Sequence, residues 1–107
     1  MPWVVETLSA AVDAEIEALP ADMRARLVRL TEIIERSGFE ALPRDNVKHL
    51  EQKLWELRVT GRDGISRAIY VTAVGRRVVI LRVFIKKTQK TPAREIELAR
   101  QRAKEVR

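Results

Sequence analysis

The apolar residues of this chain change their spacing partway along the sequence, and that change restricts the fold more than any other feature. In the first part, four large apolar residues recur every three or four positions: Met23, Leu27, Leu30 and Ile34. This spacing predicts one buried face of a helix. From Trp55 onward the spacing becomes two, as in strands. A chain that switches period in this way is expected to be α+β, with helices packed against a sheet.

Breaks in these patterns divide the chain further. The predicted elements are a strand (2–6), two helices (9–18 and 20–37), a loop (40–47), three strands (54–59, 67–74 and 77–85) and a last helix from Pro92. Gly38 is expected to end the second helix, Gly75 and Arg76 to form a two-residue hairpin turn, and Thr91 to cap the last helix. We therefore expect one domain, residues 1–107, with the order β-α-α-β-β-β-α, a mainly antiparallel sheet and helices on one face.

Basic residues are concentrated in one third of the chain. The net charge is +6, yet residues 1–47 hold five Arg against nine acidic residues. Residues 58–90 hold nine Lys or Arg and one acid, Asp63. Charge focused in this way is typical of a surface that meets a polyanion, although a solvated basic surface is the simpler alternative. Because acids within the segment are nearly absent, we favour an anionic partner.

Several common kinds of catalytic site lack their residues here. The chain has no cysteine and one histidine, His49, which leaves little to bind zinc or to build a nucleophilic triad. It has no glycine-rich phosphate loop. No apolar run approaches the roughly 20 residues of a membrane span, and no signal-peptide pattern is present. We expect a cytoplasmic protein without a metal, a small-molecule cofactor or a membrane partner.

Cationic chemistry on phosphate remains. Metal-independent RNA cleavage needs a base for the 2′-OH, an acid for the leaving oxygen, and donors that stabilise charge on phosphorus. Arginine and lysine supply such donors. One of several crowded lysines is also a candidate for proton transfer, because like charges disfavour the ionised form. From the residues alone, binding RNA and cutting RNA fit equally well.

Three segments carry a resemblance to a known family. They are KHLEQKLWELRV (48–59), RAIYV (67–71) and VVILRVFIKKTQKTP (78–92), followed by the helix EIELARQRAKE (95–105). Together they resemble the RelE/ParE superfamily of toxins from toxin–antitoxin systems, and most of all its phage-derived HigB-like branch. The resemblance implies a RelE-type fold and a ribosome-dependent mRNA endonuclease that inhibits translation. It also implies neutralisation by a cognate antitoxin, often a helix-turn-helix protein.

The resemblance also implies roles for single residues. The catalytic residues would be Arg58, Arg67, Lys86 and Lys87, with Arg67 on the scissile phosphate. The resemblance also covers Lys90, and we expect Lys90 to bind nucleic acid together with Lys48, Arg62 and Gln89. From its residue type alone, His49, expected in a loop, is a candidate general base. Some RelE toxins use a tyrosine near the C-terminus, but this chain has no Tyr, Phe, Trp or His after Pro92.

Structural roles compete with these functional ones. Arg58 could instead pair with Glu56, and His49 could be a surface or packing residue. Trp55 and Tyr70 fall at sheet positions and are expected in the core. At the level of the whole protein, two other functions compete with the endonuclease. One is a ParE-like poison of DNA gyrase without catalysis, and the other is a non-enzymatic RNA-binding regulatory domain.

Overall fold

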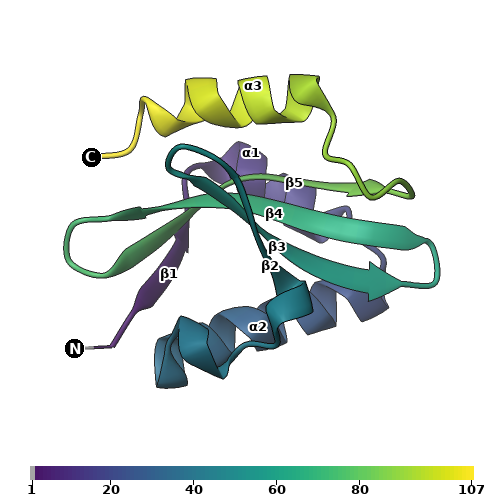
Figure 1. Ribbon diagram of the computed structural model, residues 1–107, viewed down its shortest axis with the longest axis horizontal. Coiled ribbons are helices and arrows are strands. Elements are labelled where there is room, and N and C mark those ends of the chain that lie inside the picture. Colours follow the sequence, from purple (N-terminus) through teal and green to yellow (C-terminus); the bar gives the residue numbers. More distant parts are fainter. Residues whose placement is uncertain (1) are drawn as a thin grey trace.

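A computed structural model describes residues 2–107 and shows a five-stranded sheet between helices (Figure 1). The elements are β1 (Val4–Thr7), α1 (Ala10–Glu17), α2 (Ala21–Ser37), η1 (Phe39–Ala41), η2 (Arg44–Asn46), β2 (Val47–Glu51), β3 (Leu54–Gly61), β4 (Gly64–Ala73), β5 (Arg77–Lys86) and α3 (Ala93–Ala103). The strand order is β1-β5-β4-β3-β2, and only the β1–β5 pair is parallel. The predicted α+β class and mainly antiparallel sheet are confirmed.

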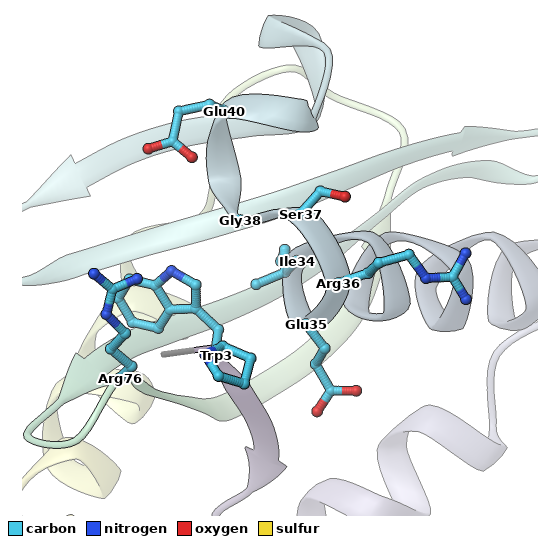
Figure 2. Close-up of a pocket in the computed structure, with 9 residues that line it drawn as sticks. Trp3, Ile34, Glu35, Arg36, Ser37, Gly38, Glu40 and Arg76 are labelled. Atoms are coloured by element: carbon cyan, nitrogen blue, oxygen red, sulfur yellow. The ribbon is translucent and has the colours of Figure 1, made fainter.

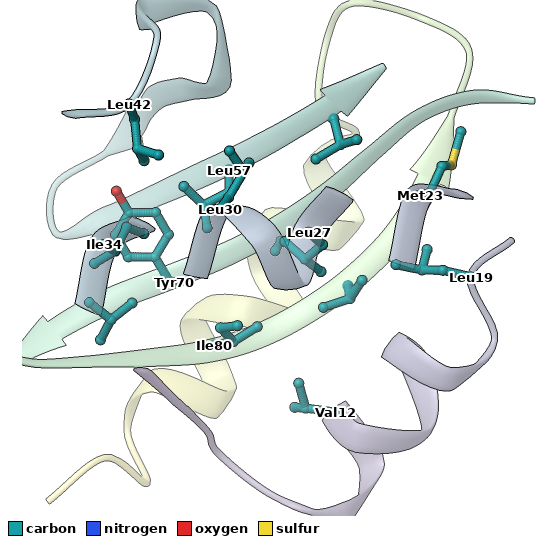
Figure 3. Close-up of a cluster of buried hydrophobic side chains, with 14 residues drawn as sticks. Val12, Leu19, Met23, Leu27, Leu30, Ile34, Leu42, Leu57, Tyr70 and Ile80 are labelled. Carbon is teal, nitrogen blue, oxygen red and sulfur yellow. The ribbon is translucent and has the colours of Figure 1, made fainter. Parts of the chain in front are cut away.

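The predicted apolar stripe of α2 forms the centre of the larger core. All four of its residues are buried: Met23, Leu27, Leu30 and Ile34. They share one cluster with Leu57 of β3, Tyr70 of β4 and Ile80 of β5 (Figure 3). Val12 of α1 joins the same cluster. Helix α2 therefore covers one face of the sheet, whereas α1 packs along β5, where Glu15 accepts from the Val83 N–H. Gly38 ends α2 as expected, with its N–H donating to Ile34 O.

The last helix lies on the other face, which corrects the expectation that all helices share one face. Figure 1 shows α3 and α2 on opposite sides of the sheet. Ala99 of α3 is buried in a second cluster with Ile69 of β4 and Leu81 of β5. The reason is visible in β4 and β5, which are apolar on both faces. A sheet with two apolar faces requires a helical layer on each.

The structure contains one strand, β2, that was not predicted. The segment expected to be a loop contains two short 3₁₀ helices, η1 and η2, and strand β2 follows them. In β2, Lys48 and His49 are both exposed, so its apolar pattern is weak. A short, charged strand is typical of the edge of a sheet, where β2 lies.

Two turns also differ from the prediction. Strands β3 and β4 extend into residues 60–66, which lie between the predicted strands 54–59 and 67–74, so that Gly61 pairs with Gly64 around Arg62 and Asp63. The turn between β4 and β5 contains three residues, 74–76, because Ala73 pairs with Arg77. Among residues 2–107, no helix combines the length and apolar character needed to cross a bilayer.

Candidate nucleic-acid interface

Strand pairing brings the predicted arginines together on the α3 face of the sheet. Arg58 of β3 lies opposite Arg67 of β4, and Arg67 lies opposite Phe84 of β5. Residues Leu57 and Ala68, their neighbours in sequence, point into the α2 core instead. Beyond Lys86, the loop 87–92 connects β5 to α3 on the same face as the arginines. Arg58 and Arg67, which the resemblance assigned to one site, are therefore direct neighbours across two strands.

Arg67 is fully buried, and its guanidinium binds the loop rather than solvent. Its side chain is 0% exposed. Nη1 donates to Gln89 O and to Thr91 Oγ1, each at 2.9 Å, and Nη2 donates to Thr88 O. Burial lowers the pKa of Arg67, the carboxylate of Glu56 opposes this effect, and the charge of Arg58 adds to it. In this geometry Arg67 has no surface with which to contact a phosphate.

Glu56 is the anion at the centre of this arrangement, and it too is 0% exposed. Glu56 Oε2 accepts from Arg58 Nε and lies 3.9 Å from Arg67 Nη1, and Oε1 accepts from Thr91 Oγ1 at 2.7 Å. The pairing of Arg58 with Glu56, weighed above as the structural alternative, is therefore present. Arg58 also donates to Gln89 O, and its side chain is 14% exposed.

Thr91 does not cap the last helix, although its position before Pro92 suggested that role. It was expected to cap the last helix, but Pro92 occupies the N-cap position and Thr91 makes no capping hydrogen bond. Its buried hydroxyl instead bridges Arg67 and Glu56. Glu56 and Thr91 were not among the predicted site residues. The one signal in the sequence is that Glu56 and Arg58 share a face in the alternating pattern LWELR.

Four cations lie at one end of the sheet, here called the basic end: Arg62, Lys86, Lys87 and Lys90. Arg62 lies in the β3–β4 turn, and that turn adjoins the end of β5 because Ile65 pairs with Lys86. Lys86 is half-buried, whereas the other three are exposed. Within residues 2–107, none of the four takes part in a salt bridge. The basic end is therefore available to an anion.

Other basic residues of the segment 58–90 are neutralised by acids from elsewhere in the chain. Arg77 pairs with Glu6 of β1. Arg82 pairs with Glu15 of α1 and Glu95 of α3, at 2.9 and 2.8 Å. Hydrogen bonding to Glu95, and then to Glu15, raises the pKa of Arg82 against the effect of burial. The charge excess counted along the sequence thus overstates the free charge on the surface.

His49 lies on the opposite face of the sheet from the arginines. It belongs to β2 rather than to a loop, and it pairs in register with Trp55. Trp55 lines a small apolar pocket with Phe39 and Tyr70 on the α2 face. The ring of His49 packs 4.7 Å from that of Trp55, and its Nε2 lies 2.7 Å from Gln52 O. This position separates His49 from Arg58, Arg67 and the basic end, which removes the geometric basis for a general base there.

The two remaining predicted residues flank the same network. Lys48 pairs in register with Glu56, on the arginine face, and its side chain is exposed at the sheet edge. Gln89 is exposed in the loop, and its backbone carbonyl accepts from both Arg58 and Arg67. Of the predicted set, all but His49 therefore lie on the arginine face of the sheet, in the β3–β4 turn or in the loop after β5.

A pocket of about 530 Å³ lies elsewhere (Figure 2). Its lining includes Trp3, Gly38 and Arg76, with the Arg76 guanidinium 5.7 Å from the centre of a Trp3 ring. Arg76 belongs to the β4–β5 turn, at the end of β5 opposite Lys86. None of the predicted site residues lines this pocket, so its size does not make it the candidate site.

Comparison with known proteins identifies the family of the chain. No curated protein matches the chain. Residues 14–104 match the family described as phage-derived protein Gp49-like (DUF891), and this range includes the arginine pair, the loop and all of α3. The chain therefore belongs to the phage-derived Gp49-like family, which is a RelE/ParE-like toxin family.

Proposed function

We propose that this protein is the toxin of a type II toxin–antitoxin module, of the HigB-like branch. It acts in the cytoplasm as a ribosome-dependent endonuclease that cuts mRNA by attack of the 2′-OH and so inhibits translation. Membership in a toxin-like family supports the toxin role. The basic end supports the choice of RNA as its target.

The basic end is the observation on which this proposal depends. Four cations without salt-bridge partners among residues 2–107 crowd one end of the sheet, which destabilises the free protein through repulsion. Phosphates of a bound strand would relieve that repulsion and release counterions. The loop that carries Lys87 and Lys90 is held from beneath by the buried arginine network.

The chemistry of cleavage is assigned to the cations that a phosphate can reach. Lys86, Lys87 and Lys90 would stabilise charge on the phosphorane. One of them would take the proton of the attacking 2′-OH and pass it to the 5′-oxygen as the bond from phosphorus to that oxygen breaks. Arg58 reaches the surface with the small exposed part of its side chain. No role in proton transfer is proposed for His49, because it lies across the sheet.

The antitoxin is the second proposed partner. A helix-turn-helix protein that covers the basic end with acidic side chains would block RNA and neutralise the toxin. Electrostatic complementarity of this kind accelerates association and excludes wrong partners. Mixing the two proteins would then abolish RNA binding at a stoichiometry set by the complex.

Primer extension on cellular mRNA after brief expression tests the proposal. The wild-type protein should create new 5′ ends within codons. Replacing Lys87 and Lys90 together by Gln should lower cleavage about 100-fold or more, because charge stabilisation at phosphorus is among the largest catalytic effects. The matched control replaces Lys53 and Arg76 by Gln, since both are exposed cations outside the basic end. Equal cleavage by both double variants would contradict the proposal.

A second candidate, a non-catalytic RNA-binding protein, is favoured by two observations. Arg67 is buried, and His49 lies on the wrong face for a base. This candidate predicts binding to ribosomes or RNA with no new 5′ ends. A DNA-damage response without translation arrest would instead indicate a poison of gyrase.

A further inference from the structure

We propose that Arg67, Glu56 and Thr91 form a latch that positions the basic loop, and that Arg67 itself does not bind the phosphate. This inference rests on the proposed function, because it concerns how the RNA-binding surface is shaped. The latch is defined by these three residues, and the basic loop by residues 87–91. Arg67 is thus a positioning residue that acts through Lys87 and Lys90.

The guanidinium of Arg67 holds the basic loop through three hydrogen bonds. It donates to the backbone carbonyls of Thr88 and Gln89 and to the hydroxyl of Thr91. These carbonyls point inward to the sheet, whereas the side chains of Lys87, Gln89 and Lys90 are exposed. One planar fork therefore sets the direction in which the lysines leave the surface.

Glu56 and Thr91 complete the latch beneath the loop. Glu56 lies on β3 and Arg67 on β4, so the two charged members of the latch stand on adjacent strands of the sheet, and only Thr91 belongs to the loop. The hydroxyl of Thr91 accepts from Arg67 and donates to Glu56, which ties the end of the loop to both charges. Groups on rigid strands hold a binding surface in place with little loss of entropy on binding.

Burial distinguishes a latch from a phosphate ligand. Both charged members, Arg67 and Glu56, are 0% exposed, and Nη1 and Nη2 of Arg67 are bonded to the loop. Arg67 Nε is also buried and has no hydrogen-bond partner within residues 2–107. A phosphate would have to displace the loop to reach the guanidinium, and this would break three hydrogen bonds and leave Glu56 buried with fewer partners.

The first test measures how often the basic loop opens. The protease Lys-C cuts after lysine, and cutting within an ordered loop requires local opening. Arg67→Lys keeps the charge but loses the fork, so cleavage after Lys87 and Lys90 should become about tenfold faster. Cleavage after Lys53 should not change. Arg82→Lys is the matched control, since Arg82 is also paired with acids on this face but does not touch the loop.

The second test asks whether Arg67 acts through the lysines. Affinity for a short fluorescein-labelled single-stranded RNA is measured at low salt, in the wild type and in the Lys87→Gln/Lys90→Gln background. Arg67→Lys should weaken RNA binding about tenfold in the wild-type background. Without the latch, Lys87 and Lys90 would be mobile in the free protein, and binding would have to order them. In the Lys87→Gln/Lys90→Gln background the loss of affinity should be less than about twofold. A merely structural role would weaken both backgrounds alike.

Each result has a defined meaning. Equal losses in the two backgrounds, or unchanged Lys-C cleavage, would overturn the latch, because Arg67 would then not act through Lys87 and Lys90. If the wild type binds no RNA, the proposed function fails, and Lys-C cleavage alone decides on the latch. If Arg67→Lys does not fold, Thr91→Val replaces it in both tests, and Thr91→Ser, which keeps the bridging hydroxyl, should restore wild-type behaviour.

Discussion

Replacing Glu56 by glutamine should destabilise the protein far more than the small chemical change suggests. The substitution keeps the shape of the side chain, but it removes the negative charge and replaces one carboxylate oxygen by an NH2 donor, so only one of the two hydrogen bonds from Thr91 and Arg58 can remain. Among residues 2–107, Glu56 is the only carboxylate that forms a salt bridge with Arg67. The variant would leave Arg67 buried without a compensating charge, beside the like charge of Arg58.

The structure sets the size of the effect. At the 3.9 Å between Arg67 Nη1 and Glu56 Oε2, the attraction is about 4 kcal/mol for an effective dielectric constant of about 20. Breaking a buried ion pair by removing one partner typically costs about 3–5 kcal/mol. Because the amide oxygen still accepts one of the two hydrogen bonds, we expect a cost of at least the lower value, about 3 kcal/mol. For a domain of this size, that corresponds to a decrease in Tm of roughly 12 °C or more.

Urea unfolding monitored by circular dichroism measures the loss. The matched control is Glu51→Gln, which makes the same chemical change on the neighbouring strand β2. Glu51 also pairs with an arginine, Arg100, but the two side chains are 37% and 45% exposed. An exposed pair contributes less than about 1 kcal/mol, so the control should remain close to the wild type. A loss below about 1 kcal/mol for Glu56→Gln, or equal losses for both variants, would refute the reasoning.

Three further predictions concern other parts of the fold. Burial raises the pKa of Tyr70 well above its usual value, so the folded state keeps a proton that the unfolded state loses, and stability should fall by up to ~1.4 kcal/mol per pH unit above about pH 10. Tyr70→Phe should remove this share of the decline, as measured by urea unfolding at several alkaline pH values. Glu15→Ala should cost about 2–3 kcal/mol, because Glu15 Oε1 accepts the Val83 N–H at 3.0 Å; thermal unfolding measures this. A methyl group at Gly61 would lie 2.6 Å from Met23 Cε, so Gly61→Ala should destabilise by about 1–3 kcal/mol through overpacking, again measured by thermal unfolding.

Each of these predictions has a contrary outcome. If Tyr70→Phe loses stability with rising pH as steeply as the wild type, the buried phenol is not responsible. Glu17 lies on the same helix as Glu15 and is 78% exposed. If Glu17→Ala costs as much stability as Glu15→Ala, the cost cannot be attributed to the hydrogen bond with Val83. Gly61→Ala should contrast with an unhindered glycine-to-alanine change, which stabilises by about 0.4–1 kcal/mol through the unfolded state. A stabilised Gly61→Ala protein would show that Met23 moves aside without cost.

The strands that carry Arg58 and Arg67 were predictable from the sequence, but the surroundings of the two residues were not. Alternation is a local property that sequence records directly, whereas a turn shorter than the predicted gap between the strands sets the register that pairs Arg58 with Arg67. Their burial depends on the loop that folds back over them and on Glu56, whose role becomes clear only when Thr91 lies against it. The side of the sheet on which His49 lies depended on its membership of β2, an edge strand with little apolar pattern.

The sequence by itself determined the class of the fold, the helix 21–37 with its apolar stripe, and the meander that ends in the lysine-rich loop. These features depend on hydrophobic period and turn residues, which act over a few positions. Only the tertiary structure decided that α3 covers the second face, that Arg82 is neutralised by Glu15 and Glu95, and that Arg67 holds the loop instead of facing solvent. Counter-charges and covering layers come from distant segments, so a charge count along the chain cannot show which cations remain free.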